Sequence, residues 1–181
     1  MELHNTTRSL AQLLGSEYTN AVINARSALS GESTEALRAI AEEPVAFYPE
    51  AVKARQEVLM NQLGTKLFPT FEENEAGAPT DAYRAAQHSA PAPLSGYGCF
   101  RAGEDGRLYF AGKSEHYHIP LGHDFHGYQL IENAKKLGIP NATHNNTRGY
   151  ITRKLERRLI ATANGLSETD PKLEAVLNSR E

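Results

Sequence analysis

The stretch that decides the fold is residues 106–165, GRLYFAGKSEHYHIPLGHDFHGYQLIENAKKLGIPNATHNNTRGYITRKLERRLIATANG. Its pattern predicts a short strand, a turn rich in His and Gly, a helix over 127–137, a turn rich in Asn, and a second helix over 149–163. Gly138 and Gly165 stand where glycine commonly ends a helix. The apolar residues of the second helix recur every fourth position and predict a buried stripe: Ile151, Leu155, Leu159 and Ala163.

A β-hairpin is expected at the start of this stretch. Residues 96–102 and 107–111 suit strands, and residues 103–106, Gly-Glu-Asp-Gly, form a hairpin signal between them. Alternating side chains are expected to bury one face of the hairpin, namely Tyr97, Cys99, Leu108 and Phe110. Further along, the apolar residues 175–177, Ala-Val-Leu, predict the beginning of a buried strand.

The N-terminal part of the chain is expected to be helical. Apolar residues recur at helical spacing over residues 10–29, and Gly31 ends that run. Ser33 is placed to cap a second helix, and Pro49 to open a third. The predicted organisation is a helical region, a linker rich in Pro, Gly and acidic residues, and a further segment: 1–71, 72–93 and 94–181. These elements predict an α+β protein with an N-terminal helical arm, a small antiparallel sheet, and helices that lead into the first strand of a further domain.

Composition excludes several classes of function. The chain has 181 residues, a net charge of -3 and a pI of about 6.2, which give no basis for nucleic-acid binding. Its single cysteine, Cys99, fits a reducing compartment. The N-terminus lacks the apolar core of a secretory signal, and no apolar run approaches the length of a membrane span. We therefore expect a cytoplasmic protein without a membrane or nucleic-acid partner.

Three local features resemble class III pyridoxal-phosphate-dependent aminotransferases. Residues 105–110, Asp-Gly-Arg-Leu-Tyr-Phe, resemble the hairpin that carries a D-G-x-x-Y pattern in those enzymes. Residues 121–123, Leu-Gly-His, resemble the L-G-H that follows that strand, and the helix over 149–163 lies where those enzymes place the first helix of their large domain. The likeness covers roughly residues 93–178. It departs from the family where Asp-Phe usually follows the tyrosine and where His-Pro usually follows G-H-x.

The resemblance implies a function for a complete enzyme of which this chain is the N-terminal portion. Such enzymes move an amino group between an amino acid or amine and a 2-oxo acid, using a lysine that forms a Schiff base with pyridoxal phosphate. In the family the lysine and the phosphate site come from the large domain, after the part matched here. The resemblance thus implies an inactive fragment with no catalytic residue and no cofactor of its own. Its implied partners are further copies of the chain or a complementary C-terminal polypeptide.

The resemblance also implies two residues that bind substrate. In the family, one wall of the substrate pocket comes from the stretch between the hairpin strand and L-G-H. By position, His116 and Tyr117 are the residues expected to line that wall.

An alternative interpretation comes from another class of protein. The chain would then be an autonomous, non-enzymatic binding module that holds a protein partner through its helical arm or a metal ion through a His cluster. Zinc takes three or four His and carboxylate ligands, and the candidates are His116, His118, His123, Asp124, His126 and His144. The cluster lacks a partner Cys pair, so the preferred interpretation assigns no metal ligand.

Overall fold

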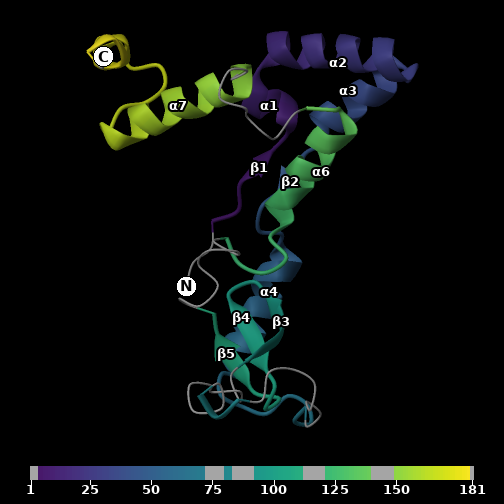
Figure 1. Ribbon diagram of the computed structural model, residues 1–181, viewed down its shortest axis with the longest axis vertical. Coiled ribbons are helices and arrows are strands. Elements are labelled where there is room, and N and C mark those ends of the chain that lie inside the picture. Colours follow the sequence, from purple (N-terminus) through teal and green to yellow (C-terminus); the bar gives the residue numbers. More distant parts are fainter. Residues whose placement is uncertain (1–3, 72–79, 83–91, 112–120, 140–148, 180–181) are drawn as a thin grey trace. The chain divides into compact units, whose positions relative to one another are not determined.

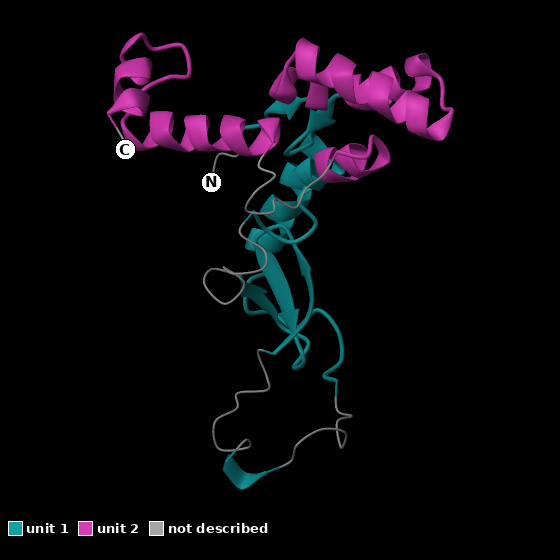
Figure 2. Ribbon diagram, turned by 45° about the horizontal axis from the view of Figure 1, so that its top comes forward, with its two compact units in different colours: residues 1–8, 44–129 teal, residues 9–43, 130–181 magenta. Residues whose placement is uncertain are grey.

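The computed structural model describes residues 4–71, 80–82, 92–111, 121–139 and 149–179 (Figure 1). It is an α+β protein whose chain divides into two compact units (Figure 2). Unit 1 contains residues 1–8 and 44–129, and unit 2 contains residues 9–43 and 130–181. The predicted α+β class is confirmed.

Unit 1 is built on a three-stranded antiparallel sheet in the order β3–β4–β5. The strands are β3 (Pro93–Tyr97), β4 (Phe100–Gly103) and β5 (Leu108–Phe110). The predicted turn over residues 103–106 does join β4 to β5. The single strand expected over 96–102 is wrong, because a second tight turn at Gly98 and Cys99 places Tyr97 opposite Phe100. Gly98 has a φ of 55°, which supplies the reversal that a continuous strand lacks.

Residues 64–71 extend this sheet beyond β5. Gly64 and Leu67 donate backbone hydrogen bonds to the carbonyls of Leu108 and Gly106, at 2.9 and 2.8 Å, and the Leu108 amide donates to Thr65 at 3.1 Å. The preceding helix, α4 (Glu50–Met60), begins directly after Pro49, as expected. These contacts make α4 and the chain that follows it part of the same unit as the sheet.

The core of unit 1 centres on Phe100, which was not among the residues predicted to be buried in the hairpin. Leu59, Phe100 and Leu108 form a buried cluster, against which Tyr97 and Cys99 pack. Phe110, expected inside, is 50% exposed and meets the edge of the Phe100 ring at a centroid distance of 6.1 Å. The two-turn path of the chain changes which side chains face inward, so the simple alternation over 96–102 does not hold.

A short two-stranded sheet completes unit 1. β1 (Thr7–Arg8) pairs antiparallel with β2 (Val45–Ala46). The pairing continues past the strands, because the Phe47 amide donates to the carbonyl of Thr6 at 2.9 Å. Chain segments nearly forty residues apart are thereby joined side by side.

The N-terminal helices of unit 2 are α1 (Leu10–Leu14), α2 (Ser16–Ser30) and α3 (Thr34–Glu42). The continuous helical run expected over 10–29 is interrupted at Gly15, whose φ is 91°. Ser33 caps α3 as expected, since its Oγ accepts the Ala36 amide at 3.2 Å. Ile23 and Leu37 are fully buried, whereas Leu29 is 86% exposed and lies outside the core.

The first α-helix after the three-stranded sheet is α6 (Gln129–Lys136), which follows a 3-10 turn, η1 (His126–Tyr128). Gly138 ends it, as expected. Its buried face includes a polar residue, Asn133, which is fully buried and donates a hydrogen bond of 2.6 Å to the Glu43 carboxylate. A buried amide of this kind stays stable only with such partners.

The helix expected over 149–163 is present as α7 (Tyr150–Ala163), capped by Gly149. The side of α7 that contacts the N-terminal helices is not the apolar stripe that was predicted to be buried. The Tyr150 ring stacks on Tyr18 at a centroid distance of 4.5 Å, and its hydroxyl donates to the Leu14 carbonyl at 2.7 Å. Leu155 and Leu159 are 55% and 61% exposed, so the stripe expected to be buried faces solvent.

The strand expected at residues 175–177 is wrong. These residues belong to a helix, α8 (Lys172–Asn178). Before the helix, the Asp170 side chain accepts the Lys172 amide at 2.8 Å, and the helix buries Leu173 completely. An apolar run of three residues does not by itself distinguish a strand from a helix, and here the complete burial of Leu173 favours the helix.

The division into units also differs from the expected boundaries at 1–71, 72–93 and 94–181. Residues 44–71 belong with the sheet, because Gln56 and Leu59 of α4 contact Cys99 and Phe100. The rest of the helical N-terminal region belongs with the C-terminal helices. Most of the expected linker lies outside the described residues. Phe71 and Ala92, on either side of that part, both bond to Glu104: the Phe71 amide donates to the Glu104 carbonyl at 2.7 Å, and the Glu104 amide donates to the Ala92 carbonyl at 2.9 Å.

Candidate functional site

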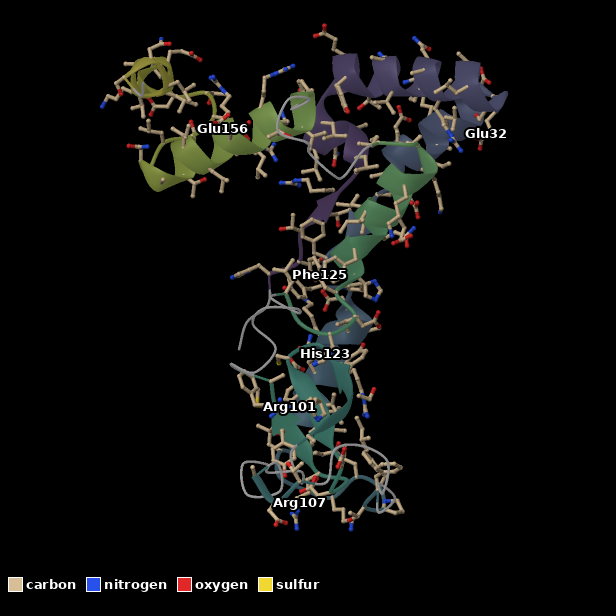
Figure 3. All side chains as sticks on the ribbon, viewed as in Figure 1. Glu32, Arg101, Arg107, His123, Phe125 and Glu156 are labelled. Carbon is tan, nitrogen blue, oxygen red and sulfur yellow. The ribbon has the colours of Figure 1, made fainter. Side chains whose placement is uncertain are left out.

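The candidate site of unit 1 is the junction where the Gly98–Cys99 turn meets the segment 121–123. Gly98 and His123 exchange two backbone hydrogen bonds, of 2.9 and 2.7 Å. The Ala111 amide donates to the Cys99 carbonyl at 2.8 Å. Figure 3 shows His123 and Arg107 at opposite ends of the sheet. We call the residues Gly96, Gly98, Cys99 and His123, together with Gln56, the turn junction.

Gln56 holds the turn junction from α4. Its side chain is 7% exposed, and its Oε1 lies 3.3 Å from both the backbone nitrogen and the Sγ of Cys99, accepting a hydrogen bond from each. Desolvation is the main cause that raises the pKa of the Cys99 thiol. A thiol kept protonated in this way is a weak nucleophile, so Cys99 acts here as a packed hydrogen-bond donor.

The His123 ring covers the backbone of Gly96. A Cβ on Gly96 would overlap the imidazole, so only glycine lets the ring lie against β3. Gly122 makes a similar close approach, since a Cβ there would stand 2.8 Å from the Gly98 carbonyl oxygen. The Leu-Gly-His segment therefore joins the sheet through both its backbone and its histidine ring.

The Asp-Gly turn at the opposite end of the sheet is closed by a side-chain network. Asp105 accepts the Tyr109 hydroxyl at 2.7 Å and the Arg107 amide at 3.0 Å. Partial burial raises the pKa of the Asp105 carboxyl, but these hydrogen bonds outweigh it, and the pKa lies below its ordinary value. The same hydrogen bond raises the pKa of Tyr109. The D-G-x-x-Y spacing thus places the first and last residues of the pattern in direct contact.

We expect this network to make the stability of unit 1 depend on pH at both ends of the scale. The lowered pKa of Asp105 stabilises the fold at neutral pH, and that contribution is lost as the pH falls through the folded-state pKa. The raised pKa of Tyr109 gives a contribution that is lost as the pH rises above the ordinary tyrosine value. Urea unfolding across pH measures both effects.

Tyr109→Phe is the variant that tests this dependence. It should remove the alkaline loss and make the acid loss shallower, because Asp105 keeps the Arg107 amide as a donor. Tyr128→Phe removes a hydroxyl elsewhere in unit 1 and serves as the control. Identical pH profiles of unfolding free energy for Tyr109→Phe and the wild type would show that the network does not contribute to stability.

Asp124, directly after the turn junction, has a left-handed backbone with a φ of 54°. Phe125 follows it and meets Phe47 and Tyr128 edge-on, with centroid distances of 5.5 and 5.4 Å. The unusual backbone at Asp124 turns the chain from the sheet edge into this aromatic cluster. Aspartate tolerates the left-handed region better than most residues, but glycine does so at lower cost.

We therefore expect Asp124→Gly to stabilise unit 1 slightly, by about 0.5 kcal/mol, because relief of strain exceeds the added chain entropy. Asp124→Val should destabilise it by about 1–2 kcal/mol, since a branched residue fits this region poorly. Hydrogen exchange of the His123 amide reports the effect, because that amide is bonded within the turn junction. The opposite order of the two variants would mean that the Asp124 side chain itself stabilises the turn.

The structure leaves the expected pocket residues untested. His116 and Tyr117 lie outside the described residues, as do His118 and His144 of the expected metal cluster. Ala111 directly precedes residues 112–120, and His123 follows them by three positions. Both form backbone hydrogen bonds with the Gly98–Cys99 turn. In the part of the chain that is described, no three His, Cys, Asp or Glu residues gather to hold a metal ion.

Sequence reasoning missed Gln56 and Gly96 as parts of the site. Gln56 lies on a helix more than forty positions from Cys99, and a single glutamine in a helix carries no pattern that predicts burial. Gly96 offered a weak signal, since an isolated glycine in a strand often marks a close approach by another group.

Comparisons with known proteins add no family to this description. No family model, curated protein or solved structure matches the chain. Among the helices in the described ranges, none is both long and apolar enough to cross a membrane.

Proposed function

We propose that the chain forms the N-terminal part of a class III-like pyridoxal-phosphate-dependent aminotransferase. In the complete enzyme, an amino group would move between an amino acid or amine and a 2-oxo acid. This chain would supply one wall of the substrate pocket, with His116 and Tyr117 on it, and would be inactive by itself. Its use of a single cysteine supports a cytoplasmic location.

The observation that carries the proposal is the meeting of the two resembling motifs on one sheet. The D-G-x-x-Y hairpin is closed by Asp105 and Tyr109, and Leu-Gly-His is paired through His123 with Gly98. The stretch on which the pocket residues are expected thus has its flanking residues tied to one turn. A pocket wall needs a scaffold that fixes its ends, and the turn junction is such a scaffold.

The described residues do not themselves fit pyridoxal phosphate. A lysine that forms a Schiff base is activated by desolvation or by a neighbouring cation. The lysines in the described ranges are all partly or fully exposed: Lys53, Lys66, Lys135, Lys136, Lys154 and Lys172. Lys66 donates to Thr70, and Lys135 pairs with Glu132. We therefore derive no step of transamination from these residues, and the proposal assigns the cofactor to the complete enzyme.

Reconstitution tests the proposal. The polypeptide encoded after the Glu181 codon is produced separately and mixed with this chain and pyridoxal phosphate. We expect transamination only in the mixture, with borohydride fixing the cofactor to a lysine of the added polypeptide. His116→Ala or Tyr117→Ala in this chain should raise KM about tenfold, as the loss of a pocket contact does. Ser114→Ala, in the same stretch, is the control.

Two results would contradict this proposal. One is borohydride fixation of the cofactor on a specific lysine of this chain alone. The other is the failure of any downstream polypeptide to bind this chain and generate activity.

The second candidate is an autonomous module that binds a protein, and the exposed face of α7 favours it. Leu155 and Leu159 lie one helical turn apart, and both side chains are exposed to solvent. If this face mediates self-association, Leu155→Ser/Leu159→Ser should shift the chain towards monomer in light scattering. Leu29→Ser, which alters an exposed leucine of α2, should not. Stoichiometric zinc after purification would instead indicate the metal-binding form of the module.

A further inference from the structure

The end of α7 carries a sequence with its own chemistry, independent of the proposed function. Asn164 is the C-cap of α7, and Gly165 follows it with a φ of 66°. This is the one Asn-Gly pair in the sequence. Both residues are exposed. The glycine has no side chain to hinder attack by its backbone nitrogen on the preceding side chain.

We propose that Asn164 is a site of spontaneous deamidation. The Gly165 backbone nitrogen gives its proton to solvent base and attacks Cγ of Asn164. A new N–C bond closes a five-membered succinimide, and the Asn164 side-chain nitrogen leaves as ammonia. Water then opens the ring at either carbonyl and leaves aspartate or isoaspartate. The sum is one amide and one water giving one carboxylic acid and one ammonia, so no oxidant or reductant is needed.

Local hydrogen bonds set how fast this reaction proceeds. The Asn164 Nδ2 donates to the Ile160 carbonyl at 2.8 Å, and the Gly165 amide donates to Thr162 at 3.1 Å. The Leu166 amide donates to Ala161 at 2.9 Å and completes the helix end. Ring closure requires the first two bonds to open. Because helix ends fray readily, we expect deamidation in the folded chain to be only roughly tenfold slower than in an unstructured peptide.

Several other asparagines in the described residues are poorer sites than Asn164. Asn20 and Asn24 lie within α2, where the helical backbone holds the following amide, and Asn133 is fully buried. Asn61 is a matched comparison for Asn164, because it is also an exposed C-cap residue. It is followed by Gln62, whose side chain hinders ring closure, so it provides an internal control in the same sample.

Deamidation would weaken the C-terminal part of unit 2. A carboxylate at residue 164 places negative charge at the negative end of the helix dipole and removes the donor to Ile160. An isoaspartate adds a carbon to the backbone beside Gly165. The connection to α8, including the ion pair of 2.6 Å between Arg157 and Glu174, should loosen as a result.

Mass spectrometry of the full-length chain tests the proposal. The chain is incubated in mildly alkaline buffer made with ¹⁸O-water and then digested with trypsin, which releases residues 159–172 with Asn164 as their one asparagine. We expect acid forms labelled with ¹⁸O at residue 164, increasing with pH, and little change at Asn61. Asn164→Gln, whose longer side chain can close only a much slower six-membered ring, should give almost none.

The synthetic peptide of residues 159–172 provides the reference rate. Conversion of the peptide while the folded chain keeps Asn164 intact would overturn the proposal, since the helix end would then protect the site. Conversion of Asn61 at the same rate as Asn164 would also overturn it.

Discussion

Replacing Phe100 by alanine is expected to lower the free energy of unfolding of unit 1 by about 3–5 kcal/mol. Phe100 is 1% exposed and stands between Leu59 of α4 and Leu108 of β5. Loss of the ring removes buried apolar area and leaves a cavity between the helix and the sheet. Because few other side chains are buried among the described residues of unit 1, little of that structure can compensate.

Hydrogen exchange measures this effect on unit 1 directly. The Leu108 amide, bonded to Thr65, should exchange faster by a factor on the order of 10²–10⁴. Phe110→Ala is the matched control, because Phe110 lies opposite Phe100 in the sheet but is 50% exposed. This substitution should lower the free energy of unfolding by about 1 kcal/mol, mostly through loss of the ring contact with Phe100. Equal effects of the two substitutions would show that the cluster around Phe100 is not the core of the unit.

Gly106→Ala is expected to destabilise unit 1 by about 3 kcal/mol. Gly106 has a φ of 78°, which costs a non-glycine residue about 1–2 kcal/mol. A Cβ at this position would also overlap the carbonyl oxygen of Phe68, a backbone atom that cannot rotate away. The Leu67 amide donates to the Gly106 carbonyl, so any shift to relieve the overlap also disturbs the pairing of residues 64–71.

A second glycine separates the two causes. Gly64 has a φ of 75° but open space around its missing Cβ. Gly64→Ala should therefore show the backbone strain alone, about 1 kcal/mol. The difference between the two variants, measured by exchange of the Leu108 amide, gives the cost of the overlap with Phe68. A larger effect at Gly64 than at Gly106 would rule out that overlap as the cause.

Local signals predicted much of the secondary structure. The cap at Ser33, the helix start after Pro49, the turn over 103–106 and the helix end at Gly138 all depend on residues within a few positions of the element they bound. For the candidate site, the sequence identified the D-G-x-x-Y and Leu-Gly-His segments. It did not show that Asp105 contacts Tyr109 or that His123 covers Gly96.

Burial was predicted less well, because it depends on what packs against an element. The every-fourth spacing in α7 defines an apolar face, yet Tyr150 stacks on Tyr18 and anchors the helix by another side, leaving Leu155 and Leu159 exposed. In the sheet, one added turn at Gly98 placed Phe100 inside and left Phe110 half exposed.

The sequence by itself determined several helix boundaries, such as the cap at Ser33 and the start after Pro49, because caps, prolines and glycines act through neighbouring backbone groups. It also determined the α+β class. Only the tertiary structure decided that residues 175–177 are helical, that α4 belongs with the sheet, and that Gln56 holds the Cys99 turn. The physical reason is that these outcomes depend on contacts between residues far apart in the chain, whose partners no local pattern specifies.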